Sequence, residues 1–463
     1  MDTMNYSSLP VYDSAEVVVC GGGVAGTFAA VAAAKEGRDV LLIEQFGMLG
    51  GSATAGLVTP VMHSHIEGDP ACSYLSAVVR ERLLTMNACD ASGRSFDPLC
   101  LKIVLEQLCV ESGVRLLYHT FVPQVIMDGD RVEAVVIANK AGLSQVKGKV
   151  FIDCTGDGDA CVWAGAEYCK GNPETGVNQP MSLRYVVDNV DFMALRAFFE
   201  EQKKATGISR NADVAPDGSS MYADCCSGHD PVTLTAVFEK AKAAGDLIPE
   251  DHSYWQCFGL RGRPGSIAFN CPEFFEHIDG TNPQDLTLAQ VTGKKAILRQ
   301  LNFYKKYFKG FENAFVSEIA VMVGIRESRE IIADHVLTAE DVYAKRKFPD
   351  MICQSNYPID IHGRVLNNQA LKPTADDGMP WYEIPFRSLL VKGKENLMVA
   401  GRCLGADFVA QASIRIQQSA RATGEATGIG AAMALAQGVS IHQIDGAKVR
   451  ERMIEKGAHF ASK

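Results

Sequence analysis

The sequence predicts an α/β protein whose first domain is divided by an inserted α+β domain. Three features of the chain support this prediction. A strand–turn–helix–strand pattern occupies residues 17–44, the pattern changes from about Ser182, and a short apolar strand at 396–402 returns to the α/β pattern. At 463 residues the chain is long enough for two to three domains. We therefore expect boundaries at 1–181, 182–384 and 385–463, with the first and last ranges forming one discontinuous domain.

The first strand and helix carry a glycine fingerprint. Gly21, Gly23 and Gly26 fit G-x-G-x-x-G directly after an apolar strand, and Glu44 ends the next strand. In such a Rossmann-like unit the first glycine allows a tight turn, the second lets backbone amides approach a pyrophosphate, and the third lets the helix pack on the strand. The helix N-terminus attracts phosphate through its free N–H groups and its dipole. Glu44 can accept hydrogen bonds from ribose hydroxyls and would repel a 2′-phosphate, which disfavours NADP. The pattern predicts a dinucleotide without choosing between FAD and NAD.

Composition limits the class of partner. The chain is 47% hydrophobic and 22% charged, as in globular proteins, and its net charge is −10. An acidic chain argues against nucleic acid and anionic membrane surfaces, which need basic patches. Residues 1–16 lack the features of a signal peptide, and no stretch reaches the roughly 18 apolar residues of a membrane span. We expect a cytoplasmic protein that acts on a small-molecule substrate. The electron acceptor is unknown, and assembly into a homo-oligomer is compatible with the sequence.

The fourteen cysteines do not predict a metal site. None of them forms a C-x-x-C pair, and most lie inside apolar runs, where a thiol behaves as a small buried hydrophobe. The spacing therefore disfavours zinc sites and iron–sulfur clusters. Cysteines inside apolar runs are compatible with a reducing compartment.

Periodicity predicts the remaining elements. In the first domain we expect helices at 72–89 and 98–112, a strand at 114–122, and a hairpin of 132–139 with 146–153. In the inserted domain we expect a strand at 182–190, a helix from about 191, strands at 254–260 and 266–271, and a helix at 284–308. A long helix is expected from about Ser413 to Gln437, where small residues at 420, 424, 428 and 431 permit close backbone packing.

Eight segments together resemble the FAD-dependent oxidoreductase family that is related to the succinate dehydrogenase and fumarate reductase flavoproteins. The segments cover most of the chain and read GGGVAG (21–26), GMLGGSATAGLV (47–58), CTGDGD (154–159), GIRESREI (324–331), YPIDIHG (357–363), YEIPFRSL (382–389), NLMVAGRCLG (396–405) and SIRIQQSARATGEATGIGAA (413–432). The resemblance implies FAD as the cofactor. The family spans many substrates, so no substrate follows.

The resemblance also implies cofactor contacts along the chain. Gly50-Gly51-Ser52 would bring backbone amides to the FAD phosphates or ribityl chain. Val122 would pair its backbone with the adenine, and Thr155-Gly156-Asp157 would close over the ribose and pyrophosphate. Gly401-Arg402 would pass the flavin ring. The helix starting near Ser413-Ile414 would aim its positive end at the pyrimidine side of the isoalloxazine, where reduction places negative charge.

Two residues near domain junctions are our candidates for chemistry. Arg387, in Glu-Ile-Pro-Phe-Arg, is expected to anchor substrate or act as an acid, and His362, in Ile-Asp-Ile-His-Gly, is expected to transfer a proton. The competing interpretations are a structural ion pair for Arg387 and a hydrogen-bonded buried histidine for His362.

Other polar residues are weaker candidates. Arg261 and Arg263 could clamp a carboxylate or phosphate, although a solvated turn is the preferred interpretation. His63 and His65 follow the second glycine stretch and could approach the flavin, including by covalent attachment. Arg326, Glu327 and Arg329 are interpreted as an ion-paired helix surface.

The sequence therefore predicts an FAD-dependent oxidoreductase that transfers a hydride between a small polar metabolite and FAD. A dehydrogenase is favoured because no dense arginine cluster appears in the sequence. The alternatives are a flavoprotein reductase of an unsaturated acid, a flavin-binding subunit that passes electrons to a redox partner, and an NAD-binding module, which the C-terminal flavin-like segments disfavour.

Overall fold

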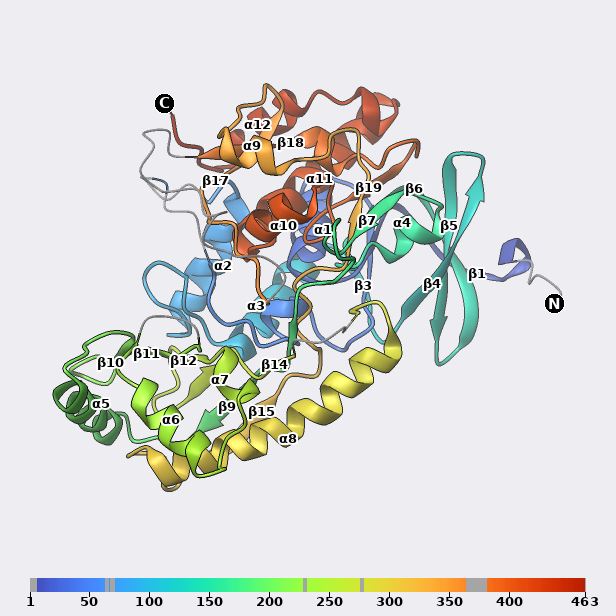
Figure 1. The fold of residues 1–463 in the computed structure, drawn as a ribbon. Helices are drawn as coiled ribbons and strands as arrows, with labels where there is room; N and C mark the ends of the chain where they lie inside the picture. Colours follow the sequence, from blue (N-terminus) through green and yellow to red (C-terminus); the bar gives the residue numbers. More distant parts are fainter. Residues whose placement is uncertain are drawn as a thin grey trace.

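The computed structural model describes residues 6–62, 66, 71–227, 231–274, 279–363 and 381–462. Its larger unit is built on a seven-stranded sheet (Figure 1). Five of the strands are parallel neighbours, and the other two extend β6 as an antiparallel meander. The strand order is β3 (Arg115–Leu117), β2 (Val40–Ile43), β1 (Val11–Cys20), β6 (Gly142–Asp153), β5 (Arg131–Asn139) and β4 (Phe121–Asp128), and β19 (Leu397–Val399) also pairs with β6.

Helix α1 (Val24–Lys35) is enclosed between this sheet and the long helix α11 (Gln417–Gln437). Alanine and glycine side chains make this close packing possible. A Cβ on Gly424 would lie 2.2 Å from the carbonyl oxygen of Ala25, and one on Gly428 would lie 2.2 Å from that of Ala29. The two backbones are therefore in direct contact, as the small residues of α11 predict.

The smaller unit contains a six-stranded antiparallel sheet, which lies at the lower left in Figure 1. Its order is β10 (Ala212–Val214), β11 (Met221–Asp224), β12 (Gln256–Gly259), β13 (Ile267–Phe269), β9 (Tyr185–Asp188) and β15 (Phe315–Ile319). Its helices are α5 (Phe192–Thr206), α6 (Thr235–Ala243), α7 (Glu250–Ser253) and the long α8 (Pro283–Tyr307). The predicted α/β class with an inserted α+β unit is confirmed.

Each unit has its own hydrophobic core. The second core holds buried residues from Met181 to Val323, together with Leu57, whereas buried residues from Ile331 to Ile384 pack in the core of the larger unit. We infer that the inserted domain ends near residue 325, earlier than the predicted 384, because the chain from β16 onward buries its apolar side chains against the first sheet.

The remaining elements surround these cores. Three two-stranded sheets pair β14 (Glu273–Phe274) with β8 (Met181–Ser182), β16 (Arg329–Ile331) with β7 (Tyr168–Lys170), and β17 (Met351–Ser355) with β18 (Tyr382–Pro385). The other helices are α2 (Tyr74–Thr85), α3 (Pro98–Glu111), α4 (Asp159–Trp163), α9 (Ala339–Tyr343), α10 (Phe408–Ile414) and α12 (Gly446–Glu455). Short 3₁₀ helices cover Tyr6–Ser8, Gly51–Ala53, Phe386–Leu389 and Ile441–Gln443.

Four sequence predictions of local structure are wrong. The strands expected at 114–122 and 182–190 are each divided, into β3 and the start of β4 in the first case and into β8 and β9 in the second. The helix expected to start near Ser413 begins at Gln417, because α10 ends at Ile414 and Ile416 adopts an extended backbone as the N-cap. The segment with Arg326, Glu327 and Arg329 is extended and ends in β16 rather than forming a helix. Arg326 and Glu327 are buried, so this segment crosses the interior between the two units.

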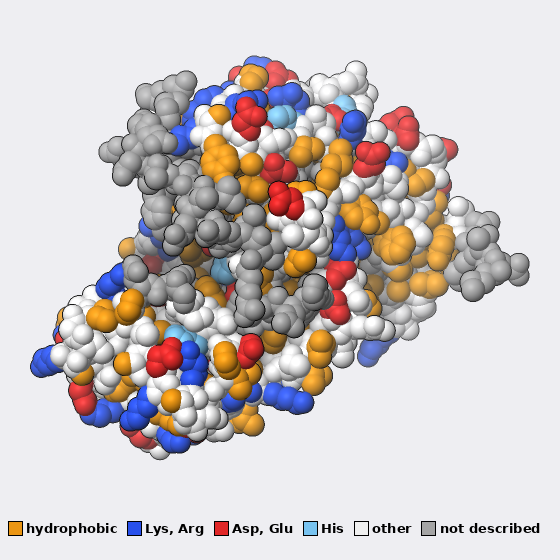
Figure 2. All heavy atoms as spheres, viewed as in Figure 1, with side chains coloured by type: hydrophobic (Ala, Val, Ile, Leu, Met, Phe, Trp, Pro, Cys, Tyr) orange, Lys and Arg blue, Asp and Glu red, His pale blue; other side chains and the backbone are white. Residues whose placement is uncertain are grey.

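The surface carries both signs of charge. On the face shown in Figure 2, basic and acidic side chains are interspersed over both units. Among the described residues, every helix is too short or too polar to cross a bilayer.

Candidate active site

A cavity of about 910 Å³ extends from the glycine fingerprint of the larger unit to the sheet of the smaller one. Its volume lies near the upper end of the range for small-molecule and cofactor sites, which is roughly 300–1,000 Å³. Its wall includes residues from α1, β12 and the start of α11, and from the turns that follow β1, β6 and β13. The cavity therefore connects the predicted dinucleotide site with the inserted domain.

The glycine fingerprint has the backbone geometry of a phosphate-binding turn. Gly21 has φ +96°, and a Cβ on it would lie 2.5 Å from the carbonyl oxygen of Cys154. Gly23 lines the cavity with open space beside its Cα, and Gly26 lies so close to Gly21 that a Cβ would be 1.8 Å from the Gly21 oxygen. The first N–H groups of α1 have no partner within the helix, as in any helix. This end of the cavity can accept a pyrophosphate.

Glu44 lies at the end of β2, buried at the cavity wall. Its carboxylate accepts hydrogen bonds from the backbone N–H of Gly22 (2.7 Å) and of Phe46 (2.8 Å). Burial raises the pKa of Glu44, while these backbone donors lower it. Each carboxylate oxygen keeps a further acceptor position, so the expected contact with ribose hydroxyls is compatible with the geometry.

The second glycine stretch packs against the first. The N–H of Gly50 donates to the carbonyl oxygen of Gly22 (2.8 Å), so this amide is already used within the protein. Gly51 approaches Gly23 closely, because a Cβ on Gly51 would lie 2.9 Å from the Gly23 Cα. Gly51 and Ser52 line the cavity, whereas Gly50 supports them from behind.

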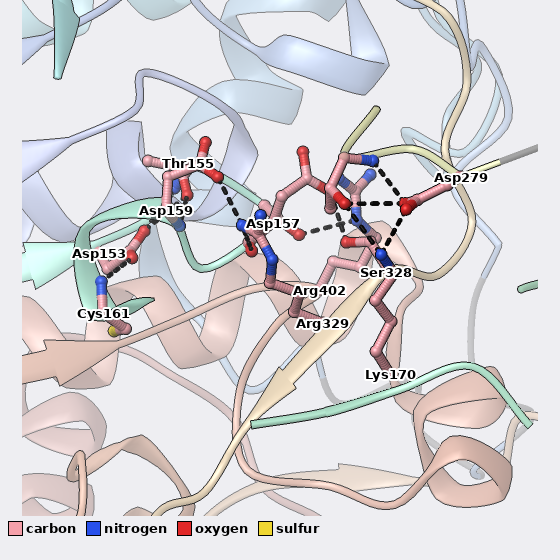
Figure 3. A network of polar contacts seen from close by, with 12 residues as sticks. Asp153, Thr155, Asp157, Asp159, Cys161, Lys170, Asp279, Ser328, Arg329 and Arg402 are labelled. Atoms are coloured by element: carbon pink, nitrogen blue, oxygen red, sulfur yellow. Dashed lines mark hydrogen bonds and ion pairs between the residues drawn. The ribbon is translucent and has the colours of Figure 1, made fainter. Parts of the chain in front are cut away.

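The loop after β6 is held by a polar network that joins the two units (Figure 3). Val122, Thr155, Gly156 and Asp157 all line the cavity. Asp157 Oδ1 accepts from Arg402 Nη2 (2.7 Å) and from Ser328 Oγ (2.6 Å). Arg402 also donates to the carbonyl oxygens of Gly156 (2.9 Å) and Ile325 (2.6 Å). The guanidinium of Arg402 thus positions the loop.

A second link lies beside this network in Figure 3. Lys170 of β7 pairs with Asp279 and donates to Thr281 Oγ1 (3.0 Å), both of which precede α8. Thr281 lines the cavity. The N-terminal end of α8 is thereby tied to the larger unit at the cavity wall.

The start of α11 contributes Ile416 and Gln417 to the cavity, while Ser413 and Ile414 lie outside its wall. Ser413 is buried in α10, where its hydroxyl donates to the carbonyl oxygen of Tyr357 (2.5 Å). Gln417 Nε2 donates to the carbonyl oxygen of Val58 (2.8 Å), and its Oε1 is buried without a hydrogen-bond partner among the described residues. The helix N-terminus expected at Ser413-Ile414 is therefore supplied three residues later.

The residues present fit FAD. An open glycine backbone at Gly23, the N-terminus of α1, the buried acceptor Glu44 and an unpartnered amide oxygen at the start of α11 all line one cavity. The residues that would hold the cofactor are Gly21, Gly23, Glu44, Gly51, Ser52, Val122, Thr155, Gly156, Asp157, Gly401, Arg402 and Gln417.

His362 also lines the cavity, where residues of the two units meet around it. Its Nδ1 is 2.9 Å from Glu273 Oε1, and its Nε2 is 3.3 Å from Asp360 Oδ2. The ring of Tyr254 packs edge-on against the imidazole, with 5.0 Å between the ring centroids. The sequence predicted this histidine but neither of its carboxylate partners.

The two carboxylates remain ionised because cations surround them. Burial alone would raise the pKa of Glu273, but the charges of Arg326 and His362 lower it. Burial opposes ionisation of Asp360 too, and His362, Arg415 and Arg326 hold its pKa well below the usual range. The site therefore places an imidazole between two anions.

Arg387 lies outside the cavity, on the surface. Its guanidinium pairs with Asp350 (2.9 Å), and 48% of its side chain is exposed. The structure does not support the expected role in substrate anchoring, and the competing interpretation as a structural ion pair describes the geometry.

The remaining candidates are also placed away from the cavity or outside the described residues. Arg261 donates to the carbonyl oxygen of Ser219 (2.7 Å) near the surface, and Arg263 pairs with Asp188 (3.1 Å). Neither arginine lines the cavity. His63 and His65 lie outside the described residues.

Sequence reasoning missed a convergence of arginines. Arg184, Arg326 and Arg415 line the same end of the cavity as His362. Two of them stand in segments that carry the family resemblance, but their positions are 89 residues apart in the sequence (415 − 326), and nothing local indicates that they meet. Arg184 follows β8 in a stretch without a motif. The sequence showed no dense arginine cluster, but the fold brings these three arginines together.

Comparisons with known proteins identify the family. The family model described as FAD dependent oxidoreductase matches residues 16–453. A search of curated proteins finds no match. Solved structures with a similar course of the chain include a geranylgeranyl bacteriochlorophyll reductase-like protein from Thermoplasma acidophilum, with 12% identity, 96% of this chain and 84% of that chain covered, and a TM-score of 0.46.

Two further similar structures are a halogenase and a dehydrogenase. The myxobacterial chondrochloren halogenase has 10% identity, with 95% of this chain and 78% of that chain covered and a TM-score of 0.48. L-proline dehydrogenase from P. horikoshii has 11% identity, with 96% and 99% covered and a TM-score of 0.42. The match of the family model across nearly the whole length shows that this chain belongs to the FAD-dependent oxidoreductase family.

Proposed function

We propose that the protein exchanges a hydride between FAD and a small polar metabolite, with His362 transferring the accompanying proton. The observation that supports this proposal is the shared cavity, because His362 and the glycines of the dinucleotide turn line one continuous space. When bound, FAD supplies two-electron redox chemistry, and the protein supplies orientation and proton transfer.

His362 is oriented for proton transfer by its two contacts. The shorter contact, from Nδ1 to Glu273, sets the ring orientation, as a carboxylate does for a catalytic histidine. The contact of Nε2 with Asp360 is longer at 3.3 Å, so Nε2 is the nitrogen that a substrate can reach. We therefore place the transferred proton on Nε2.

A reductase of an unsaturated acid is a second candidate. The sequence favoured a dehydrogenase because no arginine cluster was visible, and that reason no longer applies when Arg184, Arg326 and Arg415 line the cavity. Reduction across a double bond needs an acid and cationic groups near the reacting atoms. His362 between two carboxylates can supply the acid.

Half-reactions of the FAD-loaded protein test both directions. Oxidised enzyme is mixed anaerobically with alcohols, amines and saturated carboxylic acids, and photoreduced enzyme is mixed with unsaturated acids, while flavin absorbance is followed. Bleaching supports a dehydrogenase and recovery of absorbance supports a reductase. A purified protein that neither contains nor binds FAD would reject the proposal.

The role of His362 is tested with His362→Gln. We expect hydride exchange to slow by roughly 10²–10⁴-fold, the usual contribution of a general acid or base, with FAD affinity unchanged. Arg387→Gln is the matched control, because its side chain lies at the surface outside the cavity. Exchange at the wild-type rate in His362→Gln would exclude the histidine from proton transfer.

We also propose a reducing compartment as the location. Among the described residues the cysteines form no disulfide, and most of them are buried. Burial raises the pKa of Cys109 and Cys225 to about 12, so both remain unreactive thiols. Secretion of the native protein into an oxidising compartment would contradict this location.

A further inference from the structure

Arg184 is a cation of the cavity wall that the proposed chemistry does not use. It lies between β8 and β9, at the start of the sheet of the inserted domain. Its backbone is fixed, since the Arg184 carbonyl oxygen accepts from the N–H of Ala320 (2.9 Å). Its Nε is buried and has no hydrogen-bond partner among the described residues. Arg184 thus lines the cavity from a backbone position that is held by the sheet.

The neighbouring cations are already neutralised. Arg326 pairs with Glu273 (2.6 Å), and it donates to the carbonyl oxygen of Pro180 (2.6 Å). Arg415 pairs with Asp360 (3.0 Å). Within the part of the chain that the structure describes, these pairings leave no carboxylate for Arg184 at this end of the cavity.

Three polar side chains on and beside β12 and β13 line the cavity, but they cannot balance the positive charge of Arg184. Tyr254, Gln256 and Asn270 are neutral and bond to one another, because the Tyr254 hydroxyl donates to Gln256 Oε1 (2.9 Å) and Asn270 Nδ2 donates to the Tyr254 oxygen (2.7 Å). Burial lowers the pKa of Arg184 to about 9, and the positive charge of Arg326 acts in the same direction. The guanidinium is therefore destabilised as a cation in the absence of an anion.

We propose that Arg184 is an anion subsite and that it binds a carboxylate group of the substrate. A guanidinium presents two parallel N–H donors that match the two oxygens of a carboxylate. With a neutral His362, the three arginines and the two carboxylates leave one unbalanced positive charge. A carboxylate monoanion neutralises this charge, whereas a phosphate dianion would leave a negative charge at Arg184. This inference rests on the proposed function, since it assumes that the substrate enters the same cavity as the cofactor.

The subsite also restricts the substrate class. The carboxylate at Arg184 and the proton donor at His362 are separate points of the same cavity end, so the substrate must carry an acid group apart from its reacting carbon. A neutral sugar or a simple amine lacks the group that Arg184 requires.

Equilibrium binding to the FAD-loaded protein tests the subsite without turnover. Acetate, succinate and inorganic phosphate are titrated by calorimetry in a carboxylate-free buffer, into wild type, Arg184→Met and Arg387→Met. We expect acetate and succinate to bind wild type and Arg387→Met equally, and to bind Arg184→Met at least tenfold more weakly. Tighter binding of phosphate than of both carboxylates overturns the carboxylate class, and equal binding to Arg184→Met and wild type overturns the subsite.

Thermal stability separates an anion subsite from a structural arginine. Because the charge of Arg184 is unbalanced and its Nε is buried, Arg184→Met without added anion should melt at the same temperature as wild type or higher. Succinate should raise the melting temperature of wild type but not that of Arg184→Met. A lower melting temperature of anion-free Arg184→Met identifies a structural arginine and overturns the proposal. Arg184→Lys, which keeps the charge without the planar fork, should bind succinate with intermediate affinity.

The outcomes also distinguish this inference from the proposed function. Flavin bleaching by neutral substrates, together with absence of anion binding, rejects the subsite and leaves hydride exchange in place. Anion binding that depends on Arg184, in a protein whose flavin exchanges hydride with none of the compounds, rejects the proposed function alone.

Discussion

Gly424 of α11 lies against Ala25 of α1 so closely that a Cβ on Gly424 would be 2.2 Å from the Ala25 carbonyl oxygen. The contact joins residues from opposite ends of the chain. Ala25 also lines the cavity at the first turn of α1. The position of the phosphate-binding end of α1 therefore depends on a glycine in α11.

Gly424→Ala should weaken both folding and cofactor binding. The added methyl group has to push α11 away from α1, since the atom it meets is backbone, and overpacking of this kind costs about 1–3 kcal/mol. Urea unfolding should show this loss, and a fluorescence titration should show weaker FAD binding. Gln437→Ala, at an exposed position of the same helix, is the control and should behave as wild type. An unchanged FAD affinity in Gly424→Ala would show that α1 does not depend on this contact.

Glu425 should make stability depend on pH. Its carboxylate is buried and accepts from Ser73 Oγ (2.6 Å) and from the N–H of Leu75 (3.2 Å) at the start of α2. Burial raises its pKa from the usual 4.5 to about 7, so the folded state binds this proton more tightly than the unfolded state. The stability associated with this proton is therefore present below about pH 4.5 and is lost as the pH rises through about 7.

Glu425→Gln removes that titration. The unfolding free energy of wild type minus that of the variant should fall by about 3 kcal/mol between pH 4.5 and pH 7.5, from a shift of about 2.5 pKa units. Urea unfolding at several pH values measures the difference, in which other titrating groups cancel. Glu451→Gln, on the exposed face of α12, should show no such trend. Parallel profiles of wild type and Glu425→Gln would contradict the raised pKa.

Arg402→Gln should reduce FAD affinity by tenfold or more. The change removes donors to Asp157 and to the carbonyl oxygens of Gly156 and Ile325, and hydrogen bonds to charged groups contribute roughly 1.5–3 kcal/mol. Fluorescence titration of the apoprotein measures the affinity. Arg131→Gln is the control, since that arginine is exposed and its Nη1 lies 3.8 Å from Glu395 Oε2, away from the loop. Wild-type affinity in Arg402→Gln would show that the loop keeps its shape without the arginine.

Arg387→Gln should leave flavin reduction unchanged within about twofold. The residue pairs with Asp350 at the surface, and exposed ion pairs contribute about 0–1 kcal/mol to stability. Stopped-flow measurement of the flavin half-reaction decides the matter. A large fall in rate with full FAD occupancy would restore the catalytic role that the sequence suggested.

Local patterns in the sequence predicted the elements that local physics controls. The unit β1–α1–β2 follows from an apolar strand, a glycine turn and an Ala-rich helix, each formed by residues close in the chain. The hairpin of β5 and β6 and the long helix α8 follow from alternation and from helical periodicity. The division between α10 and α11 was not predicted, because the extended Ile416 interrupts a stretch whose composition is typical of one helix.

In the candidate site, too, local residues could be predicted from the sequence and residues from distant segments could not. The cofactor end could be predicted because Gly21, Gly23 and Glu44 stand within one supersecondary unit whose spacing has a physical reason. His362 could be named from its position near a junction. Its partners could not, since Glu273 comes from the inserted domain and Asp360 precedes the histidine in a segment without secondary structure.

By itself, the sequence determined the α/β class, the dinucleotide turn and, through the resemblance, FAD as the cofactor. Only the tertiary structure decided that Arg387 is a surface ion pair and that Arg184, Arg326 and Arg415 share a cavity with His362. The reason is physical. A turn or a helix is encoded by neighbouring residues, whereas the charge balance of a cavity depends on side chains that meet only after two separate cores have packed together.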